Sequence, residues 1–215
     1  MHARPDLRAV LKWMITRSGS VITVVIHFRF MRDSPEPKRF EILSAQAFGI
    51  SELRVGRHRV RDDDGQTCGA VHLNSIWTLR IKPSFAIHGF LTVATAEGLE
   101  YSGSKTPGWR RALLRSDDGK ELVSSNVAKT VEPILANIPL LVKSNEMTLD
   151  GIGYELIWQS DELIGSMQFN NPRSDVLRLL EITCLNLATS LTKQSDGHKM
   201  FNFVNEWKRY TRDGG

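Results

Sequence analysis

The chain has 215 residues, of which 41% are hydrophobic and 24% are charged, and its formal net charge at pH 7 is +4. That size and composition suit a folded domain that buries its own core, and they exclude a disordered or fibrous chain. The charge is unevenly spread, because residues 1–61 carry 12 Lys and Arg against 5 Asp and Glu, whereas residues 62–215 carry 16 against 19. An anionic partner would therefore meet the N-terminal third of the chain.

Residues 1–36 are expected to form an arm, a helix followed by a strand, ahead of a single α+β domain over residues 37–215. Residues 21–30 alternate apolar and polar side chains, as a half-buried strand does. Two other interpretations stay open: a targeting segment, because basic residues precede an apolar run, or an over-called start before Met31. The helix is indicated by four apolar residues at amphipathic spacing, Leu7, Val10, Leu11 and Met14.

Short β segments are predicted between residues 40 and 61. Phe40–Leu43, Ala47–Ile50 and Val55–Arg61 are the three predicted strands, and a turn of three Asp and a Gly follows the last of them. On that last strand, Arg57, Arg59 and Arg61 would project from one face. Three guanidinium groups in a row can bind phosphate or carboxylate groups, unless the neighbouring Asp side chains neutralise them.

A first clear hairpin is predicted from Val71–Ile81 and Ala86–Thr95, with Leu73, Trp77, Leu79 and Ile81 on the core face of its first strand. A tight turn at Pro83 would pair His88 with Thr78 and His72 with Ala94. The two histidines are then not neighbours, and no metal site is expected there. The polar face is a candidate binding surface, made of His72, Asn74, Thr78, Arg80 and His88.

Residues 101–120 are rich in Gly, Pro and Asp, and we predict mostly loop with a short strand at Ala112–Arg115. Two glycines of this segment have P-loop spacing, but Trp109 and Arg110 stand where the motif needs Lys and Ser or Thr. This segment is therefore not expected to bind phosphate. A helix is predicted after it from the spacing of Val127, Val131, Ile134 and Ile138.

A second hairpin and a long helix form the predicted core. The hairpin, with Trp158 paired to Leu163, gives one apolar face: Tyr154, Leu156, Trp158, Leu163, Met167 and Phe169. Asn171-Pro172 would begin a helix whose apolar stripe is Leu177, Leu180, Cys184, Leu187 and Leu191. Each apolar surface is buried only against another element, so the helix is predicted to pack on the hairpin. A last short helix would bury Met200, Phe203, Val204 and Trp207.

The predicted fold is therefore α+β: an antiparallel sheet solvated on one face, packed by a long helix in the C-terminal half and by shorter helices. No cofactor and no metal ion is expected, because no spacing of chemical groups matches a known site motif. We interpret the chain as a non-catalytic binding or protein-interaction domain of the cytoplasm. Two cysteines are too few for a secreted disulfide scaffold, and no apolar run reaches the length of a membrane span.

Two alternative functions stay open. One is nucleic-acid or anion binding through the basic N-terminal third, which would weaken with salt. The other is a small hydrolase whose site assembles from the loop 101–120, around Ser102, Ser104 and Trp109, because catalytic groups can come together from distant positions.

Overall fold

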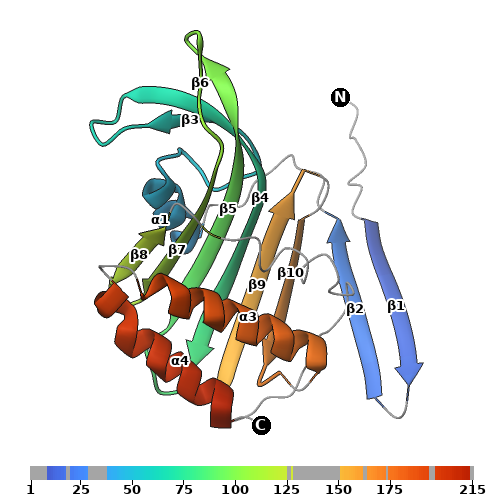
Figure 1. Ribbon diagram of the computed structural model, residues 1–215. Helices are drawn as coiled ribbons and strands as arrows, with labels where there is room; N and C mark the ends of the chain where they lie inside the picture. The colour runs from blue at the N-terminus through green and yellow to red at the C-terminus, as the bar shows by residue number, and fades with distance from the viewer. Residues whose placement is uncertain are drawn as a thin grey trace.

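The computed structural model describes residues 9–17, 20–28, 38–124, 127, 151–161, 164–172, 174–193 and 197–213. Within this part, an eight-stranded antiparallel sheet carries helices on both faces, which confirms the α+β fold class. The strand order is β10-β9-β4-β5-β7-β8, with β3 beside β4 and β6 beside β5. In Figure 1 the helices α3 and α4 lie across the front of the sheet and α1 lies behind it.

The bounds of the elements are as follows. The strands of the sheet are β3 (Gly56–Arg61), β4 (Thr67–Pro83), β5 (Gly89–Tyr101), β6 (Ser104–Lys105), β7 (Trp109–Ser116), β8 (Glu121–Ser124), β9 (Ile152–Ser160) and β10 (Ile164–Asn170). The helices are α1 (Arg39–Phe48), α3 (Asp175–Leu191), the 3-10 helix η1 (Gly197–Met200) and α4 (Phe201–Asp213).

The N-terminal segment forms a separate antiparallel hairpin of β1 (Ala9–Arg17) and β2 (Ser20–Phe28). The strand predicted over residues 21–30 is confirmed up to Phe28, where the described part of this segment ends, and the predicted helix before it is wrong. Helical spacing is a weak signal over so few residues, and pairing with β2 supplies partners for the backbone of β1 that override it. The division of the chain at residue 36 stays a prediction.

Residues 39–48 form the helix α1, so the strands predicted at Phe40–Leu43 and Ala47–Ile50 are wrong. Phe40 and Phe48 are both buried, eight residues apart on one helical face. The Glu41 side chain accepts a hydrogen bond from the Lys38 backbone N–H at 2.7 Å and so caps the start of the helix. Gly49, with φ of 69°, ends it in the left-handed conformation.

A β-bulge at Asn74 divides β4 into two halves with opposite alternation. Leu73 pairs with Ala96 and Ser75 pairs with Thr95, so one extra residue stands between them. Leu73 therefore lies on the α1 side of the sheet, whereas Trp77 packs in the core below α3. The sequence alternation placed both residues on one face, which is wrong because a bulge reverses the facing of every residue beyond it.

The connection between β4 and β5 also differs from the predicted tight turn. It takes residues 84–88, so Thr78 pairs with Thr92 and His72 pairs with Glu97. The predicted pairings of His88 and His72 are therefore wrong.

The large core lies between the sheet and the two C-terminal helices, as predicted. The α3 stripe is buried against the apolar face of β9 and β10: Leu177, Leu180, Cys184, Leu187 and Leu191. The hairpin pairs Trp158 with Gly165 instead of Leu163, and this offset of two residues keeps Tyr154, Leu156, Met167 and Phe169 on one face. Leu163 itself lies outside the described residues. The last helix is also confirmed, with Met200, Phe203, Val204 and Trp207 buried.

Three further predictions have different outcomes. The long helix begins at Asp175, with Ser174 as its N-cap, instead of at Pro172. The strand at Ala112–Arg115 is confirmed and belongs to the longer β7, so the segment 101–120 contains more sheet than predicted. The helix predicted through Val131 and Ile138 lies outside the described residues. Among the helices that the structure describes, none is both long and apolar enough to cross a membrane.

Candidate functional site

A pocket of about 360 Å³ opens on the α1 side of the sheet, between the start of α1 and the strands β4, β5 and β7. Five of its lining residues are Lys or Arg and one is Asp, so its wall is strongly positive. The lining residues are Lys38, Arg39, Phe40, Leu43, Arg80, Ile81, Lys82, His88, Gly89, Phe90, Arg115, Ser116 and Asp117.

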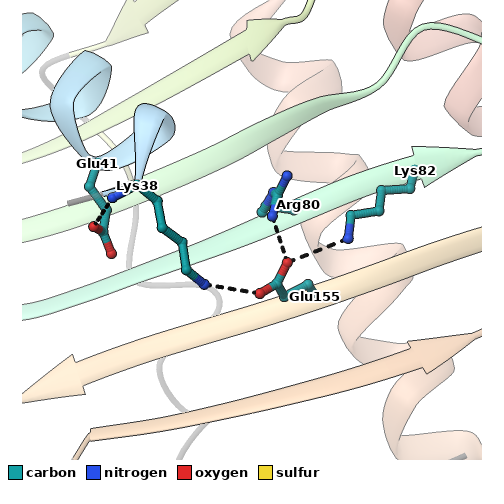
Figure 2. Close-up of polar contacts among 5 residues, drawn as sticks. All are labelled: Lys38, Glu41, Arg80, Lys82 and Glu155. Atoms are coloured by element: carbon teal, nitrogen blue, oxygen red, sulfur yellow. Dashed lines mark hydrogen bonds and ion pairs between the residues drawn. The ribbon is translucent and has the colours of Figure 1, made fainter. Parts of the chain in front are cut away.

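Glu155 on β9 holds three of these cations beside the pocket (Figure 2). Its carboxylate oxygens lie 3.2 Å from Lys38 Nζ, 2.8 Å from Arg80 Nη1 and 3.5 Å from Lys82 Nζ. Burial alone would raise the pKa of Glu155, but the three cations outweigh it and lower the pKa below the usual range. One carboxylate cannot neutralise three cations, so the cluster keeps a surplus of two positive charges.

The sheet register explains why this cluster forms. Arg80 on β4 lies directly opposite Glu155 on β9, and Lys82 is two residues further along the same face of β4. Lys38 is the residue that precedes α1, so its ion pair with Glu155 joins the helix to the sheet.

An aromatic pair forms the apolar part of the pocket wall. The rings of Phe40 and Phe90 are 5.9 Å apart and tilted by 53°. The Arg80 guanidinium lies 5.5 Å from the centre of the Phe40 ring, and Lys38 Nζ lies 5.8 Å from it. These cation–π contacts, together with Glu155, hold both cations in place.

Three buried hydroxyl groups anchor α1 beneath the pocket. Ser44 Oγ donates to Thr92 Oγ1 at 3.2 Å, and the Thr92 and Thr78 hydroxyls lie 2.9 Å apart. This chain crosses from α1 through β5 to β4, so it positions the helix that supplies Lys38 and Arg39.

The cations that line the pocket differ in whether they form an ion pair. Arg115 is paired with Glu121. Arg39 is exposed and makes no ion pair with any residue that the structure describes. Arg39 and the surplus of the Glu155 cluster are therefore the charges available to a ligand.

The polar-face residues predicted from sequence divide between different places. Arg80 and His88 line the pocket, and Thr78 is buried below it. His72 lies on the opposite face of the sheet, where its Nε2 is 3.0 Å from Asp161. Asn74 lies in the bulge, and its side-chain oxygen is buried without a hydrogen bond to any residue that the structure describes.

Arg57, Arg59 and Arg61 are exposed on β3, in the alternating pattern that the sequence predicts. In this described region, no ion pair joins them to the acidic turn that follows, and none of them lines the pocket. Their part in binding stays a prediction.

The sequence prediction missed Lys38, Arg39, Lys82, Arg115 and Glu155. Lys82 follows the predicted strand Val71–Ile81 and adjoins the turn predicted at Pro83, although its spacing of two from Arg80 places both on one face of a strand. The other residues lie at the start of α1, on β7 and on β9, and only the pairing of the strands and the packing of α1 bring them together.

A second polar cluster is buried in the large core, away from the pocket. Tyr154 Oη donates to Glu181 Oε1 at 2.5 Å and accepts from Trp207 Nε1 at 2.8 Å. Burial raises the pKa of Glu181 to about 7, although the Tyr154 hydrogen bond and the nearby Arg178 partly oppose this. The cluster joins α3, β9 and α4.

Neither a metal-binding cluster nor a similar known protein indicates the function. Within the described ranges, no three His, Cys, Asp or Glu side chains lie close enough together to hold a metal ion. Comparison with known proteins finds no family model, no curated protein and no solved structure that matches the chain.

Proposed function

We propose that the protein is a non-catalytic binding protein whose pocket takes an anionic ligand, one that carries a phosphate or carboxylate group. The observation that supports the proposal is the surplus of positive charge around Glu155 and Arg39. Holding several like charges together is unfavourable unless a counter-charge joins them. A bound anion supplies that counter-charge.

The wall chemistry suggests how such a ligand would bind. Arg39 and Lys82 would donate charge-assisted hydrogen bonds to its oxygens. Phe40 and Phe90 would contact an apolar part of the same molecule. The volume of about 360 Å³ falls at the small end of the range for small-molecule sites.

We expect the protein to act in the cytoplasm, since Cys68 and Cys184 are both free thiols.

We expect the double variant Arg39→Gln/Lys82→Gln to bind pyrophosphate at least about tenfold more weakly than the wild-type chain, because it loses two charge-assisted contacts. Isothermal titration calorimetry at low salt measures this. Arg39 makes no ion pair in the described structure and Lys82 has the longest contact with Glu155, so the fold should persist.

The matched control removes the same charge from the β3 strand, as Arg57→Gln/Arg59→Gln. It should bind pyrophosphate like the wild type. Undetectable binding by the wild-type chain would refute the proposal, and so would an equal loss in the control. A loss confined to the control would instead favour the exposed arginines of β3 as the anion site, as in the nucleic-acid alternative.

A further inference from the structure

The turn between β4 and β5 carries two exposed apolar side chains at the edge of the pocket. Phe85 is 91% exposed and Ile87 is 44% exposed. The turn leaves the pocket wall after Lys82 and returns to it at His88. Phe85 is three residues from each of them, so it lies within about 11 Å of both along the chain.

The conformation of this turn does not come from packing of the Phe85 side chain. Phe85 has φ of 61°, in the left-handed region that a bulky residue rarely adopts. A large aromatic group in water there contributes nothing to the core and stabilises no contact of the fold. Strain of this kind, held in place by surrounding structure, is typical of functional sites.

Hydrogen bonds hold both ends of the turn. The Ser84 N–H donates to Gly151 O at 2.8 Å, and the Tyr210 hydroxyl of α4 donates to Ser84 O. At the other end, the Asp117 N–H donates to His88 O at 2.8 Å. The backbone on both sides of Phe85 and Ile87 is therefore fixed, while their side chains are exposed.

We infer that this turn and the pocket together dock on an anionic phospholipid surface. The inference rests on the proposed function, since the pocket would receive a headgroup phosphate. Phe85 and Ile87 would enter the boundary between headgroups and acyl chains, which lies about 5–10 Å deep. Lys38, Arg39 and Lys82 would be attracted to the negative surface.

The size of the apolar patch favours a membrane over a protein partner. A stable protein interface buries about 800 Å² on each side. Two side chains of one short turn supply much less, whereas a lipid surface needs only a few inserted side chains beside basic residues.

The experiment is co-sedimentation of the full chain with phosphatidylcholine vesicles, with and without phosphatidylserine. We expect binding only to the vesicles with phosphatidylserine. Phe85→Ser/Ile87→Ser should weaken that binding at least about tenfold, because it removes two apolar groups from the lipid boundary. The same variant should bind pyrophosphate like the wild type, which also shows that it is folded.

Leu179→Ser is the matched control, because Leu179 is 53% exposed on α3, on the opposite face of the sheet. It should bind vesicles normally, whereas Arg39→Gln/Lys82→Gln should weaken both vesicle and pyrophosphate binding. Pyrophosphate binding without vesicle binding would overturn the inference and leave the proposed function standing. Equal vesicle binding by the wild type and the turn variant would overturn it as well. Absence of pyrophosphate binding in the wild type would remove both proposals.

Discussion

Leu180→Ala is expected to lower the free energy of unfolding by about 2–5 kcal/mol, out of a typical total of about 5–15 kcal/mol. Leu180 is 0% exposed and lies in the middle of the α3 stripe, against the sheet face that carries Leu156 and Phe169. Removing most of its side chain leaves a cavity that rigid neighbours on a sheet and two helices cannot fill. Urea denaturation of both proteins measures the difference.

Arg178→Ala is the control for this experiment, since Arg178 is exposed on the same helix two residues away. It should change the free energy of unfolding by no more than about 0.5 kcal/mol. If both variants prove equally mild, α3 does not pack on the sheet as described.

Glu181→Gln is expected to remove a loss of stability of about 3 kcal/mol that the wild-type protein suffers as pH rises from about 4.5 to 7. In the folded chain the pKa of Glu181 is about 7, because burial disfavours its charged form, whereas the unfolded carboxyl titrates near its usual value of 4.5. Between these values the folded chain holds a proton that the unfolded chain has released. Stability therefore falls through this window and does not fall further above it.

The measurement is urea denaturation of wild type and Glu181→Gln at pH 5 and pH 8. The difference between the two proteins isolates Glu181, since other titrating groups are common to both. Glu155 has the opposite sign: its lowered pKa gives stability that is lost as pH falls below about 4.5, outside this window. The amide oxygen introduced by Glu181→Gln can still accept the Tyr154 hydrogen bond. If the free energy of unfolding changes equally in the two proteins between pH 5 and pH 8, Glu181 is charged at neutral pH in the folded chain.

The large core was predictable because it depends on periodicity within single elements. The spacing of Leu177, Leu180 and Cys184 defines a helical face without knowledge of any partner. The hairpin face of Tyr154 and Leu156 was also correct despite the wrong register, since an offset of two residues preserves facing.

The errors arose where the face of a side chain, or the choice between helix and strand, depends on parts of the fold outside the local sequence pattern. The bulge at Asn74 has no sequence mark of its own, and it moved His72 away from the face of Arg80. Residues 40–50 contain short apolar runs that suggest strands. They form a helix instead, because a helix places both Phe40 and Phe48 on the face that packs against the sheet.

The pocket could be predicted only in part. Arg80 and His88 were named because they belong to one polar hairpin, whereas Glu155 was not, since its partners lie on β4 and before α1. Cross-strand pairing between segments 75 residues apart is not visible in a single sequence.

The bulge at Asn74 has an evolutionary consequence. It separates the apolar residues of β4 into two groups that face opposite sides of the sheet and share no side chain. Among the described residues, most of the buried apolar side chains lie on the α3 side, while the pocket lies on the α1 side. Apart from Ile81, which belongs to the large core and also lines the pocket, the two regions use different side chains. Selection can therefore change most of the large core, and with it thermal tolerance, without changing the residues that would contact a ligand.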